Sequence, residues 1–124
     1  MAAFTEQITF LYVSELARSS AFYGETLGLQ LVTDQGDCLI YHVVGDAYLG
    51  VCLRPGRDKD GVIVTLVTDE VDAWHETLTA SGVECVSPPN QHDKYDIYQA
   101  FYRDPDGYLV EIQRFGDPSW SQAL

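Results

Sequence analysis

The sequence has no long apolar run and few basic residues. No window approaches the roughly 18 consecutive apolar residues of a membrane-spanning helix, so the chain is not expected to cross a bilayer. Lysine and arginine number 7 against 19 aspartate and glutamate residues, which gives a formal net charge of −12. Because phosphate binding needs a basic face, this charge argues against nucleic acids and anionic membranes as partners. It is compatible with a cationic small molecule, and equally with acidity that only keeps the protein in solution.

Cysteine is also scarce. The residues Cys38, Cys52 and Cys85 are odd in number, and none belongs to a CxxC pair. This pattern predicts neither a disulfide framework nor a zinc cluster, and it favours a reducing compartment. The stretch from Met1 to Gln7 lacks the basic cluster and apolar run of a signal peptide, so a cytoplasmic location is expected. Cys52 on a strand is a candidate nucleophile, although such cysteines are usually buried and inert.

The remaining composition, 124 residues of which 46% are hydrophobic, fits one compact domain. Apolar periodicity and turn residues predict the same order of elements, strand, helix and three strands, in each half of the chain. The first half is expected to contain strand Ile8–Val13, helix Leu16–Leu27 and strands Leu29–Thr33, Cys38–Val44 and Ala47–Leu53. The second is expected to contain strand Val62–Val67, helix Glu70–Ser81 and strands Val83–Val86, Ile97–Arg103 and Tyr108–Arg114. Pro88-Pro89 is interpreted as opening a loop that runs to Asp96.

The two halves form a repeat. Ile8 and Val62 lie 54 positions apart, and so do Gly28 and Gly82, which are predicted to end the two helices. Repeats of this length indicate one structural unit written twice. The predicted fold is therefore α+β, with two βαβββ modules in pseudo-symmetric repeat, and alternation gives each sheet a helix-covered side and a cavity side. A single domain is expected over residues 1–124, with module one at about 5–54 and module two at about 61–115.

Two motifs give the chain a family resemblance. The segment Val13–Leu29 contains Phe22-Tyr23 and Leu27-Gly28, and the segment Phe101–Glu111 contains Asp104-Pro-Asp-Gly107 followed by Glu111. In this order, with the repeat between them, they resemble the vicinal oxygen chelate superfamily of glyoxalases, bleomycin-resistance proteins and extradiol dioxygenases. The resemblance implies two modules forming a curved mixed sheet around a cleft, often completed by a dimer, and small-molecule ligands. It also implies a divalent metal in many members.

The metal can be checked position by position. The resemblance places the four ligands of glyoxalase-like members at Ile8, at Val62, at Gly50 or Val51, and at Glu111. Of these only Glu111 carries a ligating side chain, and one carboxylate does not make a divalent site. No cofactor is therefore expected, and a divalent metal would need ligands outside the family positions. Extradiol dioxygenase chemistry has no support.

Glu111 is the main catalytic candidate. It alternates with Val110 and Ile112, so if those two pack on a helix, Glu111 faces the cleft and can act as a general acid or base. The alternative is that it pairs with an arginine or a hydroxyl and only shapes the pocket. The candidate binding residues are polar or aromatic strand positions, with core packing as the alternative for the phenylalanines. They are Phe10, Tyr12, Tyr41, Tyr48, Gln99, Phe101 and Gln113.

The histidines fall outside the family positions. His42 is expected on a strand, His75 within a helix and His92 in the loop before Asp96, where binding residues are more frequent. None of the three is assigned a role.

Two functional hypotheses remain. In the first, the protein binds a small organic molecule in an aromatic-lined cleft and transforms it as a glyoxalase-like lyase or isomerase, with Glu111 as base. In the second, it is a metal-free binding protein that sequesters a drug, as bleomycin-resistance proteins do. A homodimer is expected in both, because a second copy can cover open sheet edges and Trp120 can dock on a surface.

Overall fold

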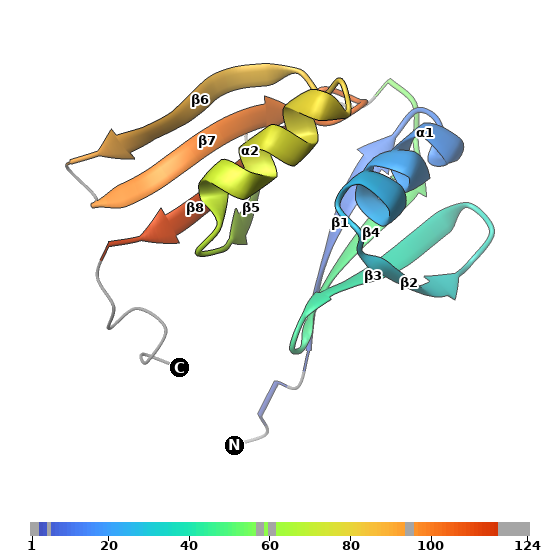
Figure 1. Cartoon of the computed structure of the whole chain (residues 1–124). Coiled ribbons are helices and arrows are strands. Elements are labelled where there is room, and N and C mark those ends of the chain that lie inside the picture. Colours follow the sequence, from blue (N-terminus) through green and yellow to red (C-terminus); the bar gives the residue numbers. More distant parts are fainter. Residues whose placement is uncertain (1–2, 5, 57–58, 60–61, 94–95, 117–124) are drawn as a thin grey trace. The chain divides into compact units, whose positions relative to one another are not determined.

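The computed structural model describes residues 3–4, 6–56, 59, 62–93 and 96–116. The chain divides into two compact units, Met1–Lys59 and Asp60–Leu124, here called unit 1 and unit 2. In each unit, one helical segment lies against one face of a four-stranded sheet (Figure 1). The predicted α+β class and the repeated βαβββ module are confirmed, with the strands divided between two mixed sheets, one for each module.

Unit 1 begins with strand β1 and continues through a helical segment into three further strands. Its elements are β1 (Gln7–Val13), α1 (Leu16–Ser20), the π-helical turn η1 (Ala21–Thr26), β2 (Gln30–Asp34), β3 (Cys38–Val44) and β4 (Ala47–Leu53). The strands lie in the order β1-β4-β3-β2, with β1 parallel to β4 and the other pairs antiparallel. Gly28, with a φ of 74°, ends the helical segment in the left-handed conformation that glycine adopts without strain.

Alternation along the strands gives the sheet of unit 1 two different faces. Side chains that point toward α1 and η1 form the core. Those from the strands include Leu11, Val13, Tyr41, Leu49 and Val51, all at most 4% exposed. Their sequence neighbours point to the other side of the sheet, which we call the open face of unit 1.

Unit 2 repeats this plan. Its elements are β5 (Ile63–Val67), α2 (Val71–Ala80), β6 (Cys85–His92), β7 (Ile97–Arg103) and β8 (Leu109–Phe115), with strand order β5-β8-β7-β6. Helix α2 packs on the sheet through buried side chains, among them Val71 and Leu78 from the helix and Tyr102, Val110 and Ile112 from the strands. The side of this sheet opposite α2 is the open face of unit 2.

The Asp-Pro-Asp-Gly motif between β7 and β8 is a hydrogen-bonded turn. The carboxylate of Asp104, only 4% exposed, accepts hydrogen bonds through Oδ1 from the backbone N–H groups of Asp106 at 2.9 Å and Tyr108 at 2.8 Å. Gly107 takes a φ of 93° and donates its N–H to the carbonyl of Asp104. The motif therefore sets the register of β7 against β8, which fixes where Glu111 lies.

The predicted loop at Pro88-Pro89 is wrong. Strand β6 continues through both prolines to His92, so His92 lies on a strand and not in a loop. Proline has no N–H to donate to a sheet, but β6 is an edge strand, and its register against β7 shifts between Ser87 and Asn90. An edge strand with an irregularity at that point accommodates the prolines that would interrupt a central strand.

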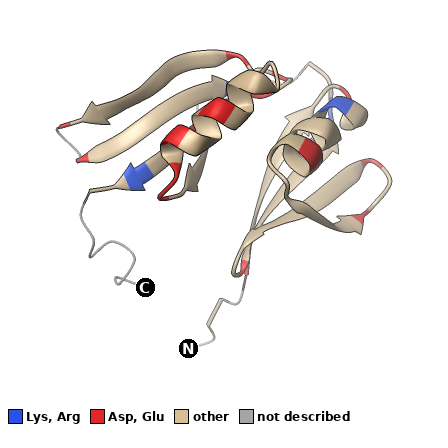
Figure 2. Ribbon diagram, in the orientation of Figure 1, with Lys and Arg blue, Asp and Glu red and all other residues tan. Residues whose placement is uncertain are grey.

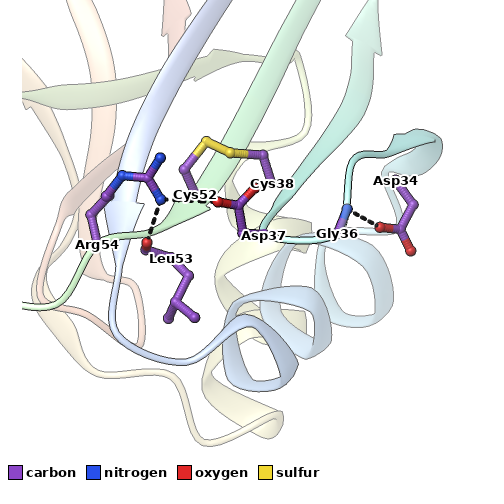
Figure 3. The surroundings of a disulfide bond; sticks show 7 residues. All are labelled: Asp34, Gly36, Asp37, Cys38, Cys52, Leu53 and Arg54. Carbon is purple, nitrogen blue, oxygen red and sulfur yellow. Dashed lines mark hydrogen bonds and ion pairs between the residues drawn. A yellow bond between two sulfur atoms is a disulfide. The ribbon is translucent and has the colours of Figure 1, made fainter.

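The expectation of no disulfide is also wrong. Cys38 and Cys52, facing each other across the antiparallel pair β3–β4, form a disulfide bond (Figure 3). The bond leaves Cys85 as the free cysteine and removes Cys52 as a candidate nucleophile, since the bonded sulfur carries no thiolate. Thirteen residues separate the two cysteines in the sequence, and only the hairpin register brings them side by side.

Some predicted features fall outside the described residues. They are Trp120 and the module limits at residues 5 and 61. Within the described part of the chain, no helix is long and apolar enough to span a membrane.

Candidate functional site

Strand β1 carries three apolar side chains on the open face of unit 1. Ile8, Phe10 and Tyr12 are 43%, 48% and 44% exposed, while the intervening Leu11 is buried under the helix. Two of these residues, Phe10 and Tyr12, are predicted binding residues. The structure brings them together in one row along an edge strand.

The ring of Phe10 lies directly over Gly50 of β4, its register partner. A Cβ atom added at Gly50 would meet Cγ, Cδ1 and Cε1 of that ring at less than contact distance. Glycine here therefore lets an aromatic ring lie close to the sheet, which is a packing reason for glycine within a strand. The result is a partly exposed aromatic surface over the middle of β1 and β4.

A hollow of about 290 Å³ lies on the same open face. It is lined by Glu6, Ile8, Val32, Thr33, Ile40 and Tyr48. Val32 and Thr33 are consecutive, so regular alternation would place them on opposite faces of β2. The register of β2 against β3 shifts between Leu31 and Thr33, and such a bulge re-aims a side chain. The bulge thus allows both Val32 and Thr33 to line the hollow.

Tyr48 stands at one side of this hollow. Partial desolvation, together with the hydrogen bond to Glu6 and the charge of that carboxylate, raises the pKa of its hydroxyl above the ordinary value. Its ring also lies beside His42, with centroids 5.4 Å apart, and His42 Nε2 is 2.9 Å from the carbonyl oxygen of Gly45. Tyr48 therefore joins Phe10 and Tyr12 on the open face, with a carboxylate at its hydroxyl end.

Tyr41 lies on the other side of the sheet. It is 1% exposed, and its hydroxyl donates to Oγ of Ser20 at 2.9 Å, beneath the helical segment. Gly24 of η1 leaves room for its ring. Tyr41 is a core residue that attaches the helix to the sheet, so it is separate from the three aromatic residues of the open face.

In unit 2, four predicted site residues share the open face. Gln99 faces Gln113 and Phe101 faces Glu111 across the antiparallel pair β7–β8. Gln99, Glu111 and Gln113 are 8%, 9% and 6% exposed. Their grouping is a consequence of the register that the Asp104 turn imposes.

Glu111 has a partner that the sequence did not indicate. Thr65 lies opposite it on the parallel strand β5, and the Thr65 hydroxyl donates to Oε1 of Glu111 at 3.0 Å. A hydroxyl gives the carboxylate one hydrogen bond and brings no positive charge to neutralise it. No signal in the sequence identifies Thr65, because a parallel partner is known only when the register is known.

The four family ligand positions can now be placed. Gly50 and Glu111 face the open sides of their sheets, whereas Val51 is fully buried under the helix. Val62 precedes β5, and by alternation with Thr65 its neighbour Ile63 takes the open face. Neither valine nor isoleucine carries a ligating atom, and the ring of Phe10 fills the space above Gly50. These residues do not fit a divalent ion, and the described residues contain no cluster of three His, Cys, Asp or Glu side chains that could hold one.

The acidic charge lies largely outside the strands. Figure 2 shows acidic positions concentrated on the helices, turns and loops of both units, with the sheets mostly uncharged. Of the eight strands in the described residues, β1, β3, β4, β5 and β6 have no Asp, Glu, Lys or Arg. Glu111 is consequently the one acidic residue in the middle of a described strand.

The contacts of His75 belong to the core. Its Nδ1 lies 2.7 Å from the hydroxyl of the fully buried Tyr102, beneath α2. Burial, with smaller contributions from Cys85 and Asp72, raises the pKa of Tyr102 to about 12, so this phenol stays protonated. The pair attaches α2 to the sheet and lies on the side opposite Glu111.

A family model describes the class of protein that this fold and these positions define. The chain belongs to the Glyoxalase/Bleomycin resistance protein/Dioxygenase superfamily, whose model matches residues 6–112. The match covers both modules and ends just after Glu111.

The chain is similar both to a probable enzyme and to a binding protein. The chain is 23% identical to a probable lactoylglutathione lyase of Vibrio cholerae, over 84% of this chain and 86% of that one. It is 24% identical to the Bacillus subtilis protein YraH, over 84% of this chain and 93% of that one. Among solved structures it is similar to TnmS3, an antibiotic-binding protein from Streptomyces sp. CB03234, with 28% identity, a TM-score of 0.80 and coverage of 94% and 99%.

Proposed function

We propose that the protein binds a small, largely apolar organic molecule on the open faces of its sheets, without a divalent metal. The observation that carries this proposal is the Phe10 ring over Gly50, at a position where glyoxalase-like members place a metal ligand. An aromatic surface offers apolar contact and stacking to a ligand. The likeness to an antibiotic-binding protein supports the same reading.

An enzyme remains the second candidate, and Glu111 favours it. Its carboxylate lies on an open face with only a neutral hydroxyl as the hydrogen-bond donor described above. A lyase or isomerase of the glyoxalase type needs a base of this kind. The similarity to a probable lactoylglutathione lyase supports this second candidate.

Metal analysis tests the metal-free part of the proposal. We expect the purified protein to contain no stoichiometric divalent metal, because three of the four ligand positions lack a ligating atom. Elemental analysis after gel filtration tests this. About one zinc, nickel, manganese or iron ion per chain, removable by a chelator, would contradict the metal-free proposal.

A binding screen then tests the function itself. Calorimetric titration of aromatic antibiotics into chelator-treated protein should detect binding without turnover of the ligand. Turnover of a thiol adduct of an α-ketoaldehyde by the same metal-free sample would instead support the lyase. A cytoplasmic location is a further part of the proposal. Disulfides are rare in that compartment, so trapping free thiols in intact cells, which shows whether Cys38 and Cys52 are bonded there, tests the location.

We expect the protein to be a homodimer. Strands β1 and β5 are sheet edges, and apolar side chains along them, including Ile8, Phe10, Ile63 and Val67, are 43–55% exposed. An exposed apolar edge strand is a template for pairing with another chain, and a second copy can cover it. Light scattering should therefore give twice the 13.8 kDa chain mass. A mass of one chain at high micromolar concentration would rule the dimer out.

A further inference from the structure

The Cys38–Cys52 disulfide lies on the same open face as the Phe10 surface. The Cys38/Cys52 pair lies two residues along β3 and β4 from the facing pair Ile40/Gly50, so both pairs share a face. The sulfurs therefore point to the side on which Phe10 covers Gly50. On the other flank of β4, Cys52 is the register partner of Tyr12. The bond thus lies on the same face as both aromatic residues of β1, in register with Tyr12 and two residues along β4 from the Gly50 that Phe10 covers.

We propose that the redox state of Cys38 and Cys52 controls the shape of this open face and, through it, the affinity for the ligand. This proposal rests on the proposed function, since it regulates the same surface. The bonded sulfurs of a disulfide lie about 2 Å apart, whereas two thiol sulfurs can approach only to about 3.5 Å. Breaking the bond therefore requires additional room on the face.

The surroundings determine where that room comes from. Cys38 and Cys52 are only 9% and 6% exposed, so their sulfurs cannot separate without moving neighbouring side chains. The neighbours on this face are Tyr12 and the Ile40/Gly50 pair, the latter beneath the Phe10 ring. Reduction is accordingly expected to displace the aromatic surface and weaken binding.

The hairpin has other contacts that hold it when the bond opens. The N–H of Leu53 donates to the carbonyl of Asp37 at 2.9 Å, and the Arg54 guanidinium pairs with Asp37 at 3.3 Å (Figure 3). The β3–β4 ladder continues from Leu39/Val51 to His42/Tyr48. Opening the bond therefore changes the face without separating the strands.

The chemical step is an ordinary thiol–disulfide exchange with a dithiol reductant. A thiolate of the reductant attacks one sulfur, the Cys38–Cys52 bond breaks, and a mixed disulfide forms. This step releases one protein thiolate, and the second thiol of the reductant then attacks the mixed disulfide and releases the other. Two electrons and two protons pass to the Sγ atoms of Cys38 and Cys52, and the reductant leaves as its own disulfide.

The test uses the full chain with Cys85→Ser, so that the pair contains its only cysteines. Cys85 provides the matched control: it lies in unit 2, on β6 opposite Tyr102, and its replacement alone should leave dye binding unchanged. Nile red, a neutral aromatic dye, is titrated by fluorescence into the oxidised protein and into protein reduced with dithiothreitol. Circular dichroism checks that the reduced form stays folded.

We expect the reduced form to bind the dye about tenfold more weakly, within the usual range of coupling between two sites. By reciprocity, saturating dye should then lower the midpoint potential of the pair by about 30 mV. The variant Cys38→Ser/Cys52→Ser should bind the dye as weakly as the reduced form, and dithiothreitol should not change its affinity. Equal affinity in both redox states, or unfolding on reduction, would overturn the proposal.

A second readout needs no ligand. The ring signals of Phe10 and Tyr12 in NMR spectra should shift on reduction, while those of Phe101 in unit 2 should not. Should neither form bind the dye, the proposed function is what fails. The ring signals then decide the redox proposal, which holds if they shift and is wrong if they stay in place.

Discussion

Replacement of Gly50 by alanine should destabilise the protein by about 1–3 kcal/mol and weaken binding of an aromatic ligand, because the added methyl group overpacks the site. The new Cβ would occupy the space of the Phe10 ring, which must then rotate away from the sheet. Phe10 is 48% exposed, so its ring can move toward solvent instead of disrupting the strands. The variant should therefore fold, but without its aromatic surface.

A double-mutant cycle identifies the cause. Phe10→Ala removes the ring, so adding Gly50→Ala in that background should cost little, with a coupling of about 0.5–3 kcal/mol between the two sites. Loss of one aromatic contact should by itself weaken dye binding by about 0.5–1.5 kcal/mol. Phe4→Ala is the matched control, since Phe4 is fully exposed and precedes β1. If thermal melts and dye titrations show that the effects of Gly50→Ala and Phe10→Ala are additive, the Phe10 ring does not interact with the side chain at position 50.

The fold was predictable because its signals are local. Strands Cys38–Val44, Ala47–Leu53 and Ile97–Arg103 have the predicted limits, since β-branched and aromatic residues alternate between clear turn residues there. Gly28 and Gly82 end the two helices with positive φ values, as predicted. The two prolines of β6 led to the wrong prediction of a loop, because proline propensity is a local signal that does not show whether a strand lies at the edge of a sheet.

The site was only partly predictable because it depends on register. Sequence alternation correctly placed Glu111 on the other face of the sheet from Val110 and Ile112. It could not pair Glu111 with Thr65 or Cys38 with Cys52. It also grouped Tyr41 with the other tyrosines, although a single step along β3 separates the face of Ile40 from the core. Whether a side chain faces a helix or a ligand surface is a property of the packed sheet.

Glu111 is expected to act on the ligand, so Glu111→Gln should leave folding nearly intact while weakening ligand binding by about 1–3 kcal/mol or abolishing turnover. The amide keeps the size of the side chain, and its oxygen can still accept the 3.0 Å hydrogen bond from Thr65. The substitution therefore removes the charge and the basicity, and little else.

Two further variants separate the effect of the charge from other effects. Glu25→Gln removes the same charge from an exposed position on η1, so it controls for the change in net charge. Thr65→Val deletes the hydroxyl but keeps the Glu111 carboxylate, and its effect on binding measures how far Thr65 positions that group. Thermal melts and ligand titrations are run on all three variants.

The results distinguish a functional carboxylate from a structural one. If Glu111 acts on the ligand, Glu111→Gln alone should cause a large loss of binding or turnover, Thr65→Val a smaller one and Glu25→Gln none. If Glu111 only holds β8 to β5, Glu111→Gln should lower the melting temperature and leave binding unchanged. In that second outcome the carboxylate would be purely structural. Its interactions within the sheet would have to offset its burial, because an unpaired buried carboxylate costs several kcal/mol or takes up a proton. That outcome would end the functional assignment of Glu111 and leave the uncharged Phe10 surface as the binding element.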